Sequence, residues 1–147
     1  MKNFFFLVLG LIIILGSVLI FFSRASVGEN QKKIIKVNNS YIKVEIADTL
    51  NAREKGLSGR KTLLDNTGML FVFDNPARRG FWMKDMNFAI DIVWIDENYL
   101  IVDIDKNVSP RTFPEVFYAD RAIKYVLEIP TGFVDKYQIA TGTMIQY

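Results

Sequence analysis

Short apolar runs separated by turn residues dominate the chain after residue 33. Residues 33–47 carry β-branched side chains on both sides of Asn38-Asn39, and asparagine tolerates the left-handed backbone of a tight turn, so this pattern predicts a β-hairpin. The other runs that predict strands are residues 69–73, 80–84, 89–96, 99–105, 122–130 and 142–147. Many short strands predict a mainly β fold, either a β-sandwich or a partly closed barrel, with one or two short helices.

Two local signals place a helix and a strand end. Asp48 or Thr49 is expected to cap a short helix that runs through Lys55 and stops at Gly56, where a positive φ costs little. Pro76 is expected to end the strand at 69–73, because proline lacks the N–H that a sheet ladder uses.

The first 24 residues differ from the rest of the chain. Residues 4–22 are 19 residues without a charge, and a helix of that length spans roughly 28 Å, close to the hydrocarbon thickness of a bilayer. We expect an N-terminal transmembrane helix that anchors the protein, with a cleaved signal peptide as the alternative because Ser23-Arg24-Ala25 loosely fits a cleavage site. Residues 25–33 are expected to be a tether, and residues 34–147 a single domain.

The charges that flank this segment bear on which side of the membrane the domain lies. Lys2 and the α-amine favour a cytoplasmic N-terminus, whereas Arg24 and three nearby lysines oppose it. We expect the membrane as the first partner and an extracytoplasmic domain, with a secreted form if the segment is cleaved.

Composition removes several kinds of chemistry. The chain contains no cysteine and no histidine, so it holds no disulfide, no Ser-His-Asp or Cys-His catalytic set and no zinc site made from these residues. We therefore expect no cofactor and no metal. Residues 103–107 imitate the start of a calcium loop, but Val108 and Pro114 stand where that loop needs glycine and glutamate.

The charge does not indicate a nucleic-acid partner. Lys2 and Arg24 account for the formal charge of +2, and the remaining basic and acidic side chains balance. Residues 30–61 do carry a local basic excess, which is either a solvated face or a surface for an anionic partner such as lipid headgroups.

Six motifs occur in the order seen in one family of uncharacterised proteins. They are REKGLSGR, GMLFVF, GFWMK, AIDIVWID, the proline of NVSP, and AIKYVLEIPTG. Over residues 44–147 the chain thus resembles the bacterial and archaeal DUF192 family, which implies a compact β domain and no established activity. The resemblance carries over Gly56, Leu57, Arg60, Gly68, Met69, Phe71, Phe81, Trp82, Met83, Asp91, Pro110, Glu128 and Gly132. The chain departs from the family pattern at Ser58, where members usually have methionine, at Asp85-Met86, where they have Asn-Thr, and at Ile90, where they have leucine.

Cationic and aromatic residues gather at one end of the predicted strand 80–84. Trp82 and Lys84 share one face of that strand and would form a platform for a sugar or an anion; a core tryptophan is the alternative. Arg78 and Arg79 precede the strand and suit carboxylate, sulfate or phosphate, or else pair with neighbouring acids. We expect Arg60 and Asp91 to organise this rim from beneath, with Arg60 clamping Asp91 or Glu128.

These residues favour non-catalytic binding of a saccharide, an anionic envelope component or an envelope partner protein. One alternative is a carboxylate-based hydrolase that uses Asp91 and Asp103, whose carboxyl groups would then lie about 5–10 Å apart across an open cleft. The other alternative is a purely structural domain, which predicts no pocket near Trp82.

Overall fold

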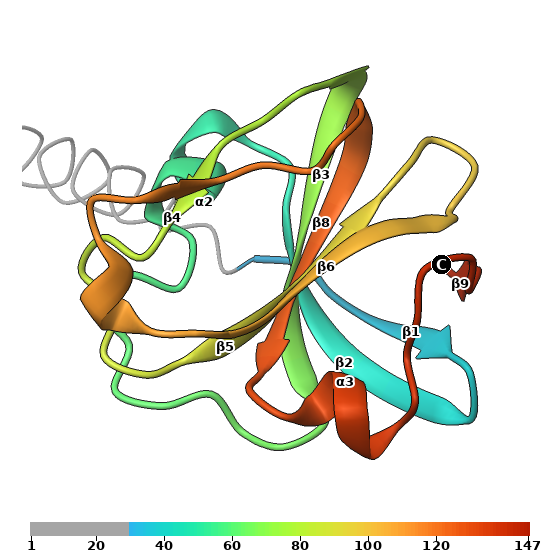
Figure 1. Cartoon of the computed structure of the whole chain (residues 1–147), viewed down its shortest axis with the longest axis horizontal. Helices are drawn as coiled ribbons and strands as arrows, with labels where there is room; N and C mark the ends of the chain where they lie inside the picture. The colour runs from blue at the N-terminus through green and yellow to red at the C-terminus, as the bar shows by residue number, and fades with distance from the viewer. Residues whose placement is uncertain (1–29) are drawn as a thin grey trace, which may run out of the picture.

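A seven-stranded sheet with the order β6-β5-β8-β3-β2-β1-β9 forms most of the protein (Figure 1). The structure is a computed structural model that describes residues 30–147. The strands are β1 (Lys32–Val37), β2 (Ser40–Ala47), β3 (Thr67–Ala77), β5 (Ile90–Ile95), β6 (Ile101–Val108), β8 (Ile123–Pro130) and β9 (Ile145–Gln146), while β4 (Phe81–Trp82) pairs separately with β7 (Val116–Phe117). The helices are α2 (Leu50–Lys55), the 3₁₀ turn η1 (Pro110–Thr112) and α3 (Phe133–Lys136).

The hairpin and the first helix lie where the sequence predicts them. β1 and β2 pair across a turn in which Asn38 has a φ of 51°. The Thr49 side chain accepts a hydrogen bond from the Ala52 backbone N–H and so caps α2, and Gly56 follows the helix with a φ of 48°.

β3 is a central strand, but it runs past Pro76, where we expected it to end. It pairs in parallel with β2 and antiparallel with β8. The β8 register shifts between Val72 and Ala77, so no ladder pair is formed by the residues in between. Because Pro76 lies in this unpaired stretch, its missing N–H interrupts no ladder.

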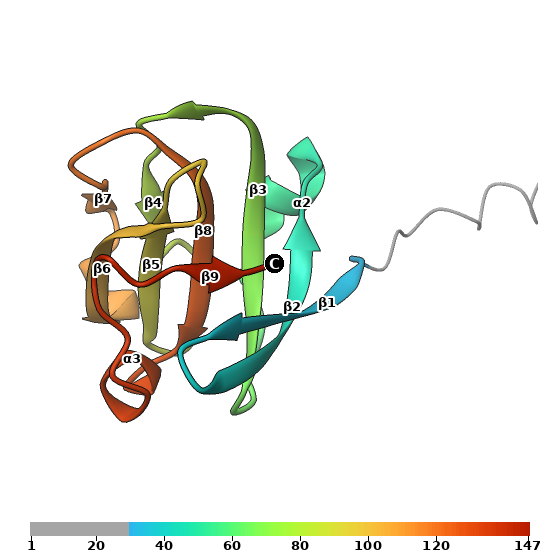
Figure 2. The same ribbon diagram turned by 90° about the vertical axis from the view of Figure 1, so that its right-hand side faces the viewer.

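The C-terminus closes one end of the curled sheet. β9 pairs with β1, and the residue before it bridges to the β5–β6 turn through Leu100 and Met144 (Figure 2). The Ile145 N–H also donates to the Tyr99 carbonyl over 2.9 Å. The mainly β prediction is confirmed, and the sheet is a curled half-barrel, which agrees with the partly closed barrel and not with the sandwich.

Apolar side chains cover both faces of the sheet and form two clusters. The concave cluster includes Leu70, Val93, Leu127 and Ile129 and is covered at one end by α3. The second cluster, on the other face, includes Met69, Ile92, Trp94 and Val126 and is covered by α2 and the β4–β7 pair. Each fully buried side chain of this size stabilises the fold by about 1.5–3 kcal/mol.

The predicted membrane anchor at residues 4–22 lies outside the described residues. Between residues 30 and 147, none of the helices has the length and apolar character that crossing a bilayer requires.

Candidate functional site

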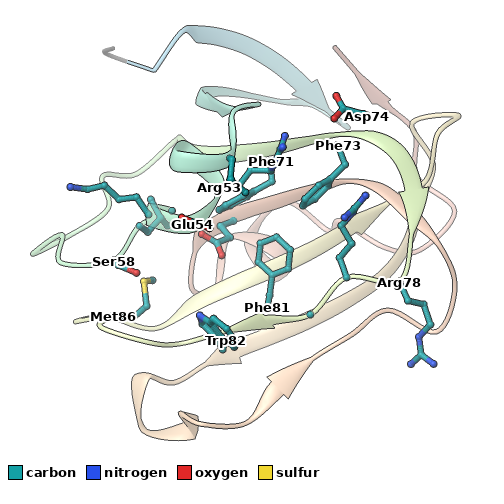
Figure 3. A pocket seen from close by; sticks show the side chains of 17 residues that line it. Arg53, Glu54, Ser58, Phe71, Phe73, Asp74, Arg78, Phe81, Trp82 and Met86 are labelled. Atoms are coloured by element: carbon teal, nitrogen blue, oxygen red, sulfur yellow. The ribbon is translucent and has the colours of Figure 1, made fainter. Parts of the chain in front are cut away.

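A pocket of about 470 Å³ opens on the sheet face that α2 and β4 cover. Side chains from α2, β3 and β4 form its walls (Figure 3). Glu128 of β8 also lines it. Of the residues that the sequence suggested for binding, Arg79 and Trp82 line this pocket, and Arg78 lies at its border with its side chain directed outward.

Three phenylalanines form a rigid apolar wall. Phe71 and Phe73 extend from β3 and Phe81 from β4, and all three point into the same space (Figure 3). The Phe81 ring meets those of Phe71 and Trp94 edge to face, with centroids 4.9 and 5.5 Å apart. Such contacts fix the rings in place, so the wall is preformed.

Trp82 lies at the mouth of this wall and is not a core residue. Its side chain is 57% exposed, whereas the neighbouring Met83 is 2% exposed. Met83 follows the end of β4 and packs into the second cluster, whereas the Trp82 side chain is left outside it.

Close packing under β4 holds this segment in position. A Cβ placed on Gly80 would lie 2.6 Å from Val116 Cγ1 and 2.9 Å from Tyr118 Cε1. Only glycine therefore allows β4 to approach β7 this closely.

Arg79 lines the pocket and carries a donor that the described part of the chain leaves unused. Its guanidinium lies 4.1 Å from the centroid of the Phe73 ring, and its Nη2 donates to the Asn75 carbonyl over 3.0 Å. Its Nε is buried and has no hydrogen-bond partner within residues 30–147. A buried donor without a partner is costly, so an acceptor from outside the chain would stabilise this arrangement.

Arg53 fixes the opposite part of the wall. Its Nη1 donates to the carbonyls of Asp48 (2.6 Å) and Val72 (2.8 Å), and its guanidinium lies 5.3 Å from the Phe73 centroid. Arg53 therefore ties α2 to β3 as well as adding positive charge.

The other two predicted rim cations point elsewhere. The Arg78 side chain extends away from the pocket in Figure 3 and lies over Tyr118, 5.6 Å from the ring centroid. Lys84 is exposed and is not among the lining residues; its backbone carbonyl accepts a hydrogen bond from Ser58 Oγ over 3.0 Å.

Glu128 is an acid on the apolar side of the sheet. It pairs across the ladder with Met69 of β3 and Ile92 of β5, and its side chain is only 6% exposed. Burial raises the pKa of the Glu128 carboxyl to about 8, and the positive charge of Arg60 opposes this rise in part. Within the described residues no group donates a hydrogen bond to this carboxyl.

Arg60 binds Glu45, not Asp91 or Glu128 as the sequence suggested. Its Nη1 and Nη2 donate to the two carboxylate oxygens of Glu45 over 2.6 and 2.8 Å. The hydrogen bonds and charge of Arg60 lower the pKa of Glu45. This pairing follows from the topology, because β2 lies beside β3 in the sheet and Glu45 is thereby within reach of Arg60.

Asp91 lies on the opposite face of the sheet from the pocket. It pairs with Ile129 of the concave cluster and is 1% exposed. Its carboxylate accepts hydrogen bonds from the backbone N–H groups of Asn107 (2.8 Å) and Val134 (3.1 Å), so it caps the first turn of α3. Asp91 thus pairs with backbone donors, not with Arg60 or Lys84.

The structure does not bring Asp91 and Asp103 into one cleft. Asp103 pairs across the ladder with Trp94, whose side chain belongs to the second cluster, so the two acids face opposite sides of the sheet. One carboxylate oxygen of Asp103 accepts the N–H of Ile104 over 2.8 Å.

Sequence reasoning missed Glu128 as a pocket residue, although a signal was present. Glu128 stands between Leu127 and Ile129 in an apolar strand, as Asp91 stands between Ile90 and Ile92, and a carboxylate in such a strand needs a partner. Ser58 and Met86, two positions at which the chain departs from the family pattern, also line the pocket.

Comparisons with known proteins agree with this fold. A UPF0127 protein of Thermococcus sibiricus is 28% identical over 108 residues, which span 71% of this chain and 66% of that relative. The structure is similar to a crystal structure from Novosphingobium aromaticivorans of a protein of unknown function (TM-score 0.77, 26% identity, 82% of this chain and 89% of that one). It is also similar to a crystal structure from Sinorhizobium meliloti of a protein described as a candidate transcription regulator (TM-score 0.78, 24% identity, 82% and 97%), a likeness that shows the fold alone.

The family comparison covers almost the whole described domain. Residues 33–147 match the sequence model of DUF192, described as an uncharacterised ACR, in line with the resemblance read from the six motifs. The UPF0127 protein that this chain resembles is likewise named without a function. This chain therefore belongs to the DUF192 family.

Proposed function

We propose that this protein is a membrane-tethered, extracytoplasmic binding domain whose pocket takes an anionic saccharide. One observation carries the proposal: Arg79, whose buried Nε has no hydrogen-bond partner within residues 30–147, lines the same pocket as the exposed Trp82. A guanidinium N–H suits an oxyanion, and an exposed indole suits the apolar face of a sugar ring.

The walls allow both groups to act on one ligand. A sugar ring would lie against Trp82 and the edge of Phe81, and its carboxylate, sulfate or phosphate would accept the Arg79 Nε–H. Because Phe73 and Asn75 already hold the Arg79 guanidinium, little side-chain entropy is lost on binding. Arg53 and Lys55 add positive charge to the walls and outweigh Glu54 and Asp74 once Arg79 is included.

The location of the domain is a separate part of the proposal. The uncharged run at residues 4–22 has the length of a bilayer span, and β1 begins at Lys32, within the last two residues of the expected tether. This spacing would hold the pocket close to the membrane surface, where anionic envelope saccharides occur.

A calorimetric titration tests the binding. The full chain in detergent micelles is titrated with a trimer of galacturonic acid and with a trimer of galactose, which differ mainly in the charged group at C6. We expect the acidic trimer to bind and the neutral trimer to bind at least about tenfold more weakly. The reason is that a charge-assisted hydrogen bond contributes about 1.5–3 kcal/mol.

Two neighbouring arginines provide a matched pair of variants. R79A removes the donor in the pocket, whereas R78A removes a cation of the same kind that points away from it. We expect R79A to weaken binding about 10- to 100-fold and R78A to change it less than threefold. Equal losses in both variants, or none in R79A, would contradict the proposed site.

Membrane topology is tested by protease treatment of intact cells and of lysed cells. A tethered extracytoplasmic domain sediments with membranes and is digested once the outer surface of the membrane is accessible. A domain that is protected until the membrane itself is lysed would contradict the extracytoplasmic location.

A further inference from the structure

Glu128 contributes an acidic side chain to the lining of the pocket. Its strand neighbours across the sheet, Met69 and Ile92, are fully or almost fully buried and apolar, and nothing within residues 30–147 donates to it. A glutamate that is only 6% exposed and lines a pocket has the position of a recognition group.

The cation whose charge acts on Glu128 does not donate a hydrogen bond to it. Arg60 uses both Nη atoms on Glu45, which lies in the same row of the sheet because Glu45 pairs with Met69 and Met69 with Glu128. The charge of Arg60 thus acts on both Glu45 and Glu128, but only Glu45 accepts its hydrogen bonds. The other charged side chains around the pocket, which come from α2, β3 and the segment before β4, are Arg53, Glu54, Lys55, Asp74, Arg78 and Arg79.

We propose that the Glu128 carboxyl forms a second subsite, which holds a neutral hydroxyl or amide group of the saccharide by donating its proton to an oxygen of that group. This inference rests on the proposed function, because the anionic group of the same ligand is bound at Arg79. A protonated carboxyl offers one donor and one acceptor, which is what a hydroxyl or an amide can satisfy.

Charge argues against the two other kinds of ligand group at this position. A cation would have to pass the guanidinium groups of Arg53 and Arg79, and an anion would meet a carboxyl in an apolar surrounding that disfavours any unpaired charge. A neutral group avoids both costs and leaves the proton on Glu128.

Binding should therefore depend on one proton. Since burial raises the pKa of Glu128 to about 8, the carboxyl keeps its proton at neutral pH and loses it in mildly alkaline solution. The chain contains no histidine, so no imidazole titrates in the same range.

The test is the affinity of the full chain in micelles for the galacturonic acid trimer between pH 6 and 9.5. For the wild type we expect constant affinity near pH 6. Above about pH 8 the affinity should fall by a factor that approaches ten per pH unit, which is the largest dependence that one linked proton can produce. E128Q keeps a donor and an acceptor but cannot ionise, so it should bind within about threefold of the wild type at pH 6 and show no pH dependence. E128M keeps the length without either group and should bind at least about tenfold more weakly at every pH.

The outcomes separate this inference from the proposed function. Tight wild-type binding that does not change up to pH 9.5 overturns only the role of Glu128. Equal loss in E128Q and E128M, with both variants folded by circular dichroism, also overturns it, since the ionised carboxylate would then be the required form. If the wild type binds no trimer at any pH, both proposals fail.

Discussion

Arg60 and Glu45 form a two-bond ion pair, with both guanidinium Nη atoms 2.6 and 2.8 Å from the carboxylate oxygens. The pair joins the segment after α2 to β2 and keeps the arginine beside the buried Glu128. It therefore has a structural role and an electrostatic one, and a substitution at Arg60 should reveal both.

R60K should lose the paired geometry, because an ammonium group cannot donate two parallel hydrogen bonds to one carboxylate. We expect the free energy of unfolding in urea to fall by about 1 kcal/mol, since the pair is partly exposed. R60A should in addition raise the pKa of Glu128, because the opposing charge is lost; the ¹³C shift of the Glu128 carboxyl measures this. An unchanged or lower pKa would contradict the coupling.

The stability of the fold should depend on pH through Glu128. The pKa of its carboxyl is about 8 when folded and near its ordinary value of 4.5 when unfolded, so the folded state binds the extra proton between these values. The wild type should therefore lose stability relative to E128Q as pH rises from about 5 to about 8, by up to about 1.4 kcal/mol per pH unit. Urea unfolding of both proteins at several pH values measures the difference, and a constant difference would refute a buried, protonated Glu128.

Glu45 should affect the pH dependence of stability in the opposite direction from Glu128 and at lower pH. Because Arg60 lowers the pKa of Glu45, the stability that the pair contributes is present above the unfolded pKa and is lost as the pH falls through the folded pKa. E45Q should remove this acid-side loss. The same urea titrations below pH 5 detect it, and a wild type that keeps its full stability there would be inconsistent with the pair.

Asp91 should matter for folding and not for binding. D91A leaves the N–H groups of Asn107 and Val134 without their acceptor, which should cost about 3 kcal/mol. D103A is the matched control, because Asp103 accepts only the N–H of the next residue and is half-buried, and should change stability by less than about 1 kcal/mol. If D91A unfolds no more readily than D103A, the capping role is wrong.

The two pocket positions that depart from the family pattern should set ligand preference. Ser58 and Met86 line the pocket, and S58M adds volume there while it removes the hydroxyl that donates to the Lys84 carbonyl. We expect S58M to weaken binding of the galacturonic acid trimer about tenfold, whereas K84A, outside the pocket lining, should leave it unchanged. Calorimetry measures both, and identical affinities would remove Ser58 from the binding surface.

Local features were predictable from the sequence, and pairings across the sheet were not. The hairpin at residues 33–47 and the helix between Thr49 and Gly56 depend on turn and cap residues that lie next to each other in the chain. The pairing of Arg60 with Glu45 depends on strand order, which periodicity does not reveal. Helix α3 was missed because it has four residues and a glycine N-cap, and its side-chain acceptor comes from Asp91, 43 residues earlier than Val134.

The pocket likewise combines residues that were predictable from the local sequence with one that was not. The exposed aromatic and the cation beside it, Trp82 and Arg79, were visible as a local cluster at the start of β4. The acid that completes the pocket comes from β8, and only the folded sheet places it beneath them.

The most direct test of the central claim is the ¹⁵N resonance of Arg79 Nε during titration with the galacturonic acid trimer. A new hydrogen bond from this buried donor should shift the Nε–H signal and slow its exchange with water, while the signal of Arg78 stays in place. If the trimer binds and the Arg79 signal does not move, or moves no more than that of Arg78, the saccharide is not bound in this pocket.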